Sequence, residues 1–145
     1  SAAVVDGGDA GKVTLMISGS RCKVETKIEN GKPAFDLIIS CDANIGAINE
    51  DVKERIGGEY YALFERELAD QLKKETESVL QKTVLENQCD IFRFGRRLLQ
   101  KHTEYWKQNH ANWEELMSQA DYRVSVEAHI QRVGQEITPN LANSY

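Results

Sequence analysis

The chain of 145 residues is poor in cysteine and proline and lacks any long apolar run. Its three cysteines are far apart and include no CxxC pair, so the ligand spacing of a structural zinc site is missing. No apolar stretch approaches the ~20 residues that a membrane-spanning helix needs. With 41% hydrophobic and 28% charged residues, the composition predicts one globular domain.

Positive charge is also in short supply, because 23 acidic residues outnumber 18 basic ones and give a formal net charge of -5. An acidic chain binds nucleic acid or an anionic membrane surface poorly unless its basic residues are clustered. We therefore expect no nucleic-acid partner, while a local basic patch stays compatible with the composition.

Catalytic and metal-binding patterns are missing as well. The three histidines, His102, His110 and His129, show neither HxH nor HxxxH spacing. Glu114 and Glu115 are adjacent, so on a helix their side chains point about 100° apart and do not converge as an acid and base pair would. We predict no enzyme activity, no catalytic residues, no metal site and no cofactor.

The domain boundaries follow from composition. Residues 1–11 are rich in Gly and Asp and resemble no signal peptide, so we interpret them as a linker or a cloning remnant. Residues 12–134 are predicted to form a single α+β domain of a longer protein. Residues 135–145 are predicted to be a C-terminal tail.

The N-terminal half alternates apolar and polar residues, as strands do. We predict strands over 12–17, 21–29 and 33–43, with a bulge or a tight turn at 18–20. Asn30-Gly31 is typical of a type I′ hairpin turn, whose central residues need positive φ. The resulting register pairs Val24 with Leu37 and places the apolar side chains on one face.

The same register makes Cys22 and Cys41 diagonal neighbours. A diagonal separation of about 7–8 Å between Cα atoms is too long for a relaxed disulfide. We therefore predict that both cysteines are buried in the core as free thiols.

The following region is predicted to be helical. Residues 44–58 are interpreted as a loop or helix lead-in, and 59–87 as one long amphipathic helix without proline. Asp90 is predicted to cap a second helix, and Thr103 and Asn112 to cap two short ones. A final strand follows over 122–131.

Strands followed by helices and one more strand predict an α+β fold. We expect an antiparallel sheet of about four strands, hairpin-rich in the N-terminal half and completed by the C-terminal strand. One long helix and two or three short helices are expected to pack on one face of this sheet.

The second helix carries the main candidate interaction residues. Arg93, Arg97 and Lys101 are spaced at i, i+4 and i+8, which places them in a basic stripe opposite Phe94 and Leu98. The stripe is either an ordinary solvated face or a docking strip for an acidic partner or a lipid headgroup. The predicted structural anchors are Phe94, Gly95, Trp106 and Trp113, because buried indoles contribute large contact areas and a mid-helix glycine suggests close backbone approach.

Two blocks of sequence resemble the C-terminal domain of the Ger(x)C family, the lipoprotein C subunits of spore germinant receptors. The first runs from Gly11-Lys-Val-Thr-Leu to the Asn30-Gly-Lys-Pro turn and Phe35. The second contains Asp90-Ile-Phe-Arg-Phe-Gly-Arg, Trp106-Lys, Trp113-Glu-Glu and the series from Val124-Ser-Val to Ile130-Gln-Arg-Val-Gly134. The prolines expected before Tyr105 and after Met117 are missing, which affects the expected helix ends.

This resemblance implies a non-catalytic domain that acts in receptor assembly and nutrient-triggered germination signalling. It implies two multi-pass membrane partners, the receptor A and B subunits, and an N-terminal lipid anchor outside this chain. The implied location is the outer face of the spore inner membrane. The alternative is a small-ligand-binding module of a cell-envelope lipoprotein, which would need a pocket between sheet and helix.

Overall fold

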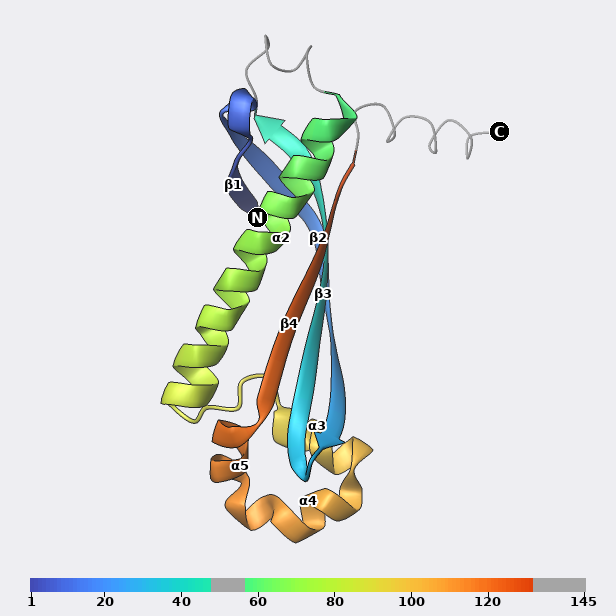
Figure 1. The fold of residues 1–145 in the computed structure, drawn as a ribbon, viewed down its shortest axis with the longest axis vertical. Coiled ribbons are helices and arrows are strands. Elements are labelled where there is room, and N and C mark those ends of the chain that lie inside the picture. Colours follow the sequence, from blue (N-terminus) through green and yellow to red (C-terminus); the bar gives the residue numbers. More distant parts are fainter. Residues whose placement is uncertain (48–56, 132–145) are drawn as a thin grey trace, which may run out of the picture. The chain divides into compact units, whose positions relative to one another are not determined.

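The computed structural model describes residues 1–47 and 57–131 and contains a four-stranded sheet with one long and three short α-helices (Figure 1). The strands are β1 (Ala2–Asp6), β2 (Lys12–Glu29), β3 (Lys32–Ala47) and β4 (Asp121–Ile130). The long helix α2 (Gly58–Val79) continues as a π-helical segment, η2 (Leu80–Glu86). The short helices are α3 (Phe94–Lys101), α4 (Thr103–Asn109) and α5 (Trp113–Gln119), with 3-10 turns at Gly8–Ala10 (η1) and His110–Asn112 (η3).

The sheet has the order β1-β2-β3-β4. β1 is antiparallel to β2, with Ala3 opposite Leu15 and Val5 opposite Val13. The predicted turn joins β2 to β3, and its central residues Asn30 and Gly31 have φ of 53° and 78°. These positive φ values are what a type I′ turn requires, so the hairpin prediction is confirmed.

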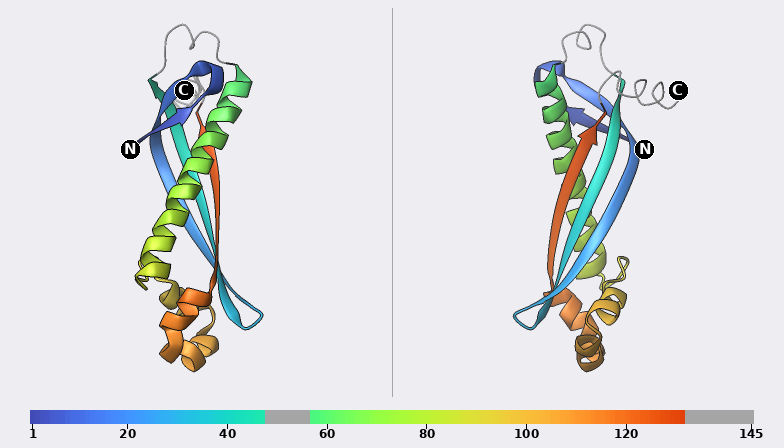
Figure 2. Two further views of the ribbon diagram at one scale, coloured as in Figure 1. Left: turned by 60° about the vertical axis from the view of Figure 1, so that its left-hand side comes forward. Right: turned by 90° about the vertical axis from the view of Figure 1, so that its right-hand side faces the viewer.

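β4 lies beside β3 and runs in the same direction (Figures 1 and 2). Asp36 of β3 contacts Arg123 of β4, and farther along both strands the Gln131 N–H donates to the Ala43 carbonyl. Both residue numbers increase together, as in a parallel pair. The α+β class and the four strands are confirmed, but the sheet is mixed rather than wholly antiparallel. The direction differs because the long helical connection lets the chain return to the starting end of β3.

The chain divides into two compact units. The first unit comprises residues 1–21, 39–72 and those from 126 onward. Its core joins the strands to α2, and the fully buried members include Val13, Leu15, Phe64 and Leu68. Glu65 of α2 accepts the Ile130 N–H at 2.9 Å, which satisfies a donor on the outer edge of β4.

The second unit comprises residues 22–38 and 73–125, and its core is aromatic. Phe35 of β3 lies with its ring centroid 4.5 Å from that of Phe94 and 5.6 Å from that of Tyr122. The Tyr122 hydroxyl donates to the Met117 carbonyl at 2.6 Å, and burial raises the pKa of Tyr122 well above its usual range. The hydroxyl group of this buried ring therefore has a hydrogen-bond partner within the protein.

The N-terminal segment differs from its prediction. Residues 2–6, expected to be part of a linker, form the edge strand β1, and Ala3 and Val5 are buried in the first core. Burial alternates along the strand, and valine at positions 4 and 5 favours the extended conformation despite the short length. Residues 44–47, expected to begin a loop, extend β3, whereas most of that loop and the tail 135–145 lie outside the described residues.

Three local predictions on β2 and the helix ends also need correction. β2 is continuous through residues 18–20, which excludes the tight turn, one of the two alternatives predicted there. Cys22 is exposed, although Cys41 is buried as predicted and both thiols are free. Thr103 and Asn112 form no side-chain caps, and the Thr103 hydroxyl instead donates to the Leu99 carbonyl at 2.8 Å.

Candidate interaction surface

Helix α3 is fixed at its start by a carboxylate. The two oxygens of Asp90 accept hydrogen bonds from the Phe94 N–H at 2.7 Å and the Gly95 N–H at 2.9 Å. These donors have no partner within the helix, so the predicted capping role of Asp90 is confirmed. Arg93 occupies the position just before the helix with φ of 57°, which is uncommon for a residue with a side chain.

The buried side of α3 contains the predicted anchor residues. Phe94 is fully buried, and Gly95 lies under the two indoles: a Cβ added there would meet Trp106 at 3.0 Å and Trp113 at 3.2 Å. The indole rings contact each other edge to face, with centroids 5.5 Å apart. Phe94, Gly95, Trp106 and Trp113 therefore come together in one cluster, in which a side chain at position 95 would require the indole rings to shift.

The outer side of α3 carries the basic residues, and it differs in detail from the predicted stripe. Arg93 and Lys101 are exposed, but Arg97 is half-buried and its Nε donates to the Phe92 carbonyl at 3.3 Å. Arg96, which the i, i+4 reasoning missed, is exposed. The signal that would have found it is composition: residues 91–103 contain four basic residues and no acidic one.

Two large apolar side chains lie exposed on or next to this helix. Ile91 and Leu99 remain 49% and 42% exposed, although α3 buries Phe94 and Leu98 completely. On the helix itself, Leu99 and the exposed Arg96 are neighbours at i, i+3, whereas Lys101 lies about 140° around the helix from Arg96.

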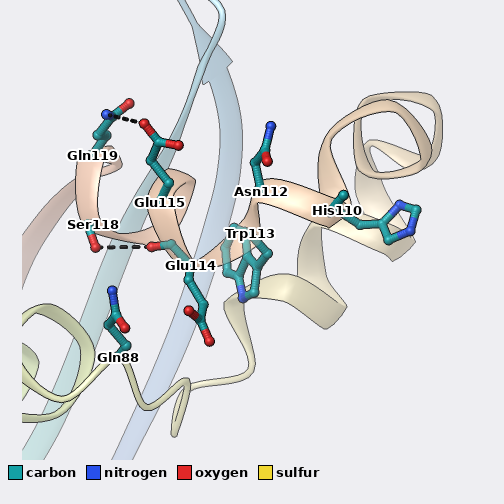
Figure 3. Close-up of a pocket in the computed structure, with 9 residues that line it drawn as sticks. Gln88, His110, Asn112, Trp113, Glu114, Glu115, Ser118 and Gln119 are labelled. Carbon is teal, nitrogen blue, oxygen red and sulfur yellow. Dashed lines mark hydrogen bonds between the residues drawn. The ribbon is translucent and has the colours of Figure 1, made fainter.

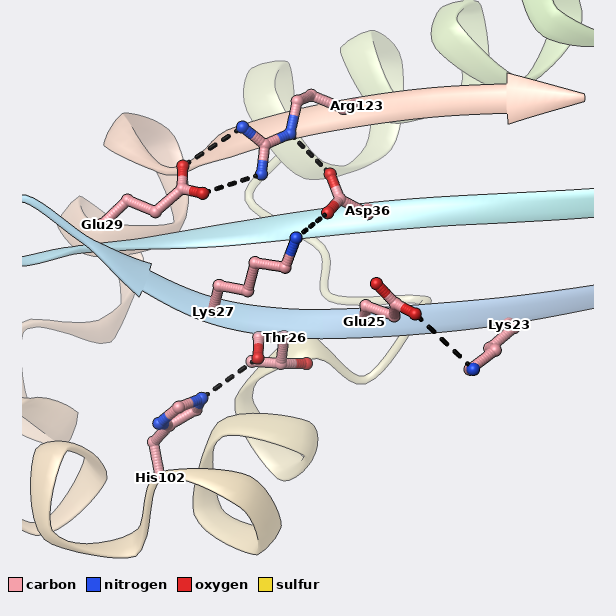
Figure 4. Close-up of polar contacts among 8 residues, drawn as sticks. All are labelled: Lys23, Glu25, Thr26, Lys27, Glu29, Asp36, His102 and Arg123. Atoms are coloured by element: carbon pink, nitrogen blue, oxygen red, sulfur yellow. Dashed lines mark hydrogen bonds and ion pairs between the residues drawn. The ribbon is translucent and has the colours of Figure 1, made fainter.

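Contacts with the hairpin hold α3 and α4 in place (Figure 4). His102, between these helices, forms a hydrogen bond through Nε2 to the Thr26 carbonyl of β2 at 3.0 Å. The Tyr105 hydroxyl donates to the Gly31 carbonyl of the turn at 2.9 Å, and burial raises the pKa of Tyr105. The exposed residues of α3 are therefore presented from a helix whose position is fixed by these contacts.

A charged network lies across the three strands of the second unit (Figure 4). Arg123 of β4 donates to both oxygens of Glu29, at 3.1 and 3.2 Å, and to Asp36, which also pairs with Lys27 at 3.1 Å. The hydrogen bond from Arg123, followed by that from Lys27, lowers the pKa of Asp36. The same contacts, that with Glu29 first, raise the pKa of Arg123. With each charge paired, this network stabilises strand pairing and leaves no free group for chemistry.

The second unit also contains an open hollow of about 650 Å³ (Figure 3). Its lining is mostly polar and comes from η3, α5 and the residue Gln88. It does not lie between the sheet and a helix, where a small-ligand module was expected to have its pocket. Among residues 1–47 and 57–131, no three His, Cys, Asp or Glu side chains are grouped to hold a metal ion. Within the same ranges, no helix has the length and apolar character to cross a membrane.

Comparison with known proteins identifies related sequences along nearly the whole chain. The family model "Spore germination B3/ GerAC like, C-terminal" matches residues 2–134. Spore germination protein B3 of Bacillus subtilis (strain 168) is 22% identical over 84% of this chain and 33% of its own length. Spore germination protein KC of the same organism is 25% identical over 88% of this chain and 31% of its own length.

A crystal structure of the GerBC protein has the same fold. It matches 91% of this chain and 41% of its own with a TM-score of 0.76, at 20% sequence identity. The chain thus spans about a third of the length of the curated relatives that it matches. The matched region includes β1, which the sequence alone had suggested to be outside the domain.

Proposed function

Because the chain belongs to the family of spore germination B3/GerAC-like C-terminal domains, we propose that it is a non-catalytic domain of a germinant receptor C subunit. The observation that carries this proposal is the family match over residues 2–134, supported by the shared fold of the GerBC protein. The proposed role is receptor assembly and nutrient-triggered germination signalling.

The proposed partners are the A and B membrane subunits of the receptor. We place the parent protein at the outer face of the spore inner membrane, held by an N-terminal lipid anchor outside this chain.

The surface proposed for these contacts is the basic strip of Arg93, Arg97 and Lys101. Its helix is fixed by Asp90 at one end and by the bond from His102 to β2 at the other. A fixed basic strip favours an acidic partner surface or lipid headgroups through charge complementarity.

The proposal is tested by purifying the full-length parent from spore inner membranes with and without residues 2–134. We expect the A and B subunits to co-purify only when the domain is present. A second version carries Arg93→Glu, Arg97→Glu and Lys101→Glu, with Lys73→Glu, Lys74→Glu and Lys82→Glu on the long helix as the matched control. Equal recovery of A and B without the domain would contradict the assembly role. If the α3 charge reversals reduce co-purification no more than the control charge reversals do, the basic strip is not the contact surface.

The alternative function is binding of a small ligand, which the hollow next to α5 favours. Its charged lining residues Glu114 and Glu115 would select ligands with an amino group. Calorimetry of the isolated chain with nutrient amino compounds tests this alternative. Heat that disappears in Glu115→Gln would support it, and the absence of heat from any compound would exclude it.

A further inference from the structure

We propose that the region of the parent protein that precedes this domain packs against the outer face of the sheet in the first unit. The contact surface contains three exposed residues, Ala2, Val4 and Met16, which we call the β1–β2 strip. The inference rests on the proposed function in one respect, since it takes the chain to be the C-terminal domain of a longer C subunit.

The β1–β2 strip lies on the side of the sheet that α2 does not cover. Ala3 and Val5 of β1 belong to the core that also contains Phe64 of α2. Ala2 and Val4 alternate with them along the strand and are exposed. Because successive side chains of a strand point to opposite faces, the strip faces away from this core.

Met16 continues the strip on the neighbouring strand. It lies directly opposite Ala2 in the pairing of β1 with β2, and Val4 is its diagonal neighbour, within reach of a long side chain. Val4 and Met16 are 55% and 46% exposed, and they are two of the five large hydrophobic side chains that are exposed among the described residues. Met16 also lies over Gly46 of β3, where an added Cβ would be 2.7 Å from the Met16 Cγ. The strip is therefore a continuous apolar surface.

The absence of charge distinguishes this strip from the polar side of β2 in the second unit. There the strand carries a series of charged residues that take part in ion pairs: Lys23, Glu25, Lys27 and Glu29. Polar side chains of this kind are usual where one face of an antiparallel sheet meets water. Neighbouring exposed apolar groups, in contrast, are typical of a surface that another part of a protein covers.

The size of the strip favours a partner that is covalently linked to it. A stable interface between separate proteins takes about 20–30 residues on each side, which is far more than the strip offers. A linked partner needs fewer contacts, because a short tether holds it at an effective concentration on the order of mM.

The preceding region of the parent is the linked partner that lies nearest to the strip. The curated relatives match over 33% and 31% of their own length, and the family model describes a C-terminal domain, so most of each relative precedes the matched part. The match begins at residue 2, which is the first residue of β1 and belongs to the strip. Both views in Figure 2 show this end of β1 away from the part of α2 that belongs to the first unit. A chain that arrives here from a preceding domain therefore enters beside Val4 and Met16.

The two methionines of the chain test this proposal without any substitution. Met16 is half-exposed, whereas Met117 in the second unit is buried, and oxidation of methionine to the sulfoxide by hydrogen peroxide depends on access to the sulfur. Mass spectrometry follows both residues in the isolated 145-residue chain and in the full-length parent without its lipid anchor. We expect Met16 to react rapidly in the isolated chain and to slow to nearly the rate of Met117 in the parent. Met117 should react slowly in both samples, which shows that the domain is folded.

A charged substitution in the strip should open the contact. In the parent, Val4→Glu should restore rapid oxidation of Met16, because burying an unpaired carboxylate at the contact is costly. The matched control is Val79→Glu, which changes a valine that is also exposed but lies at the end of α2, and it should leave Met16 protected. In the isolated chain, Val4→Glu should leave both thermal unfolding and the slow oxidation of Met117 nearly unchanged.

Three results would overturn the proposal. The first is oxidation of Met16 at equal rates in the parent and in the isolated chain. The second is slow oxidation of Met16 in the isolated chain, because the chain itself or a second copy would then cover the strip. The third is protection of Met16 only when the A and B subunits are present, which would assign the strip to a receptor subunit. Co-purification of A and B with the parent tests the proposed function separately from all three.

Discussion

The two units of this molecule build their cores from different side chains. The first unit packs aliphatic strand residues such as Leu15 against one face of the long helix α2. The second unit has helices of eight, seven and seven residues, and α4 buries none of its residues completely. Its core contains a cluster of mutually contacting rings from several elements, including Phe35, Phe94 and Tyr122, whereas the first core takes its buried rings from α2 alone.

Helix length explains the difference. A long amphipathic helix supplies many moderately sized contacts, whereas each short helix has few inward positions. A ring that buries roughly 150–250 Å² supplies from one position what several aliphatic residues supply together. Short helices also need their free N–H groups satisfied, which is where Asp90 acts. The second unit therefore depends strongly on the rings that its short helices and strands bring together.

The largest expected effect comes from removing one ring from each core. Phe94→Ala and Phe64→Ala each delete a completely buried ring and should lower the free energy of unfolding by about 3–5 kcal/mol. Hydrogen exchange should show the loss of protection mainly in the unit that contains the substitution. Uniform loss along the whole chain in both variants would mean that the two units unfold as one cooperative body and that the comparison has no energetic meaning.

A smaller effect is expected from adding one methyl group. Gly95→Ala places a Cβ about 3.0 Å from Trp106 and 3.2 Å from Trp113, so it should cost about 1–3 kcal/mol through overpacking. Gly19→Ala in the first unit is the control, because no atom lies within 4 Å of its Cβ position. Denaturant unfolding measures both. If the alanine at 95 is as stable as the control, the indoles adapt freely and the aromatic cluster is loosely packed.

The smallest expected effect is on the pH dependence of the second unit. The hydrogen bond from Arg123 lowers the pKa of Asp36, so its stabilising effect is present above the unfolded-state pKa of about 3.9. As the pH falls through the lower folded-state pKa, protonation removes that effect. Asp36→Asn should therefore lower the Tm at neutral pH and converge with the unmodified chain in acid.

The matched control for this pH effect is Glu25→Gln, which removes a single exposed pair with Lys23 at 3.5 Å. Its thermal unfolding should differ little from that of the unmodified chain at any pH. A constant difference between Asp36→Asn and the unmodified chain at every pH would contradict the electrostatic explanation.

Local sequence signals predicted much of the secondary structure. The features that were not predicted depend on contacts between residues far apart in the sequence. Asn30-Gly31 specified its turn because few residues accept positive φ, and Asp90 preceded an apolar helix pattern at capping distance. The direction of β4 has no such signal, since its pairing with β3 is decided by a long connection. Cys22 alternates with apolar neighbours, yet it lies where that face of β2 is not covered.

The candidate surface was predictable to a similar extent. The basic character of α3 is plain in the sequence, whereas the burial of Arg97 depends on the path of residues 91–93 before the helix. The exposure of Leu99 could not be predicted either. Periodicity shows which residues share a helix face, but it does not show how much of that face the rest of the protein covers. The π-helical end of α2 also leaves no mark in the apolar periodicity of 59–87.

The bond from His102 to Thr26 has a consequence for the solubility of the chain. β1 pairs with β2 only as far as Met16, with one further bond at Ile17, so from Cys22 onward β2 is an outer strand of the sheet. Outer strands with free carbonyl and N–H groups recruit strands from other molecules and so promote aggregation. The imidazole is hydrogen-bonded to the Thr26 carbonyl of this outer strand, and the Tyr105 hydroxyl donates to the Gly31 carbonyl of the turn that follows it. The junction between α3 and α4 therefore covers part of this edge and should hinder the addition of a strand from another molecule.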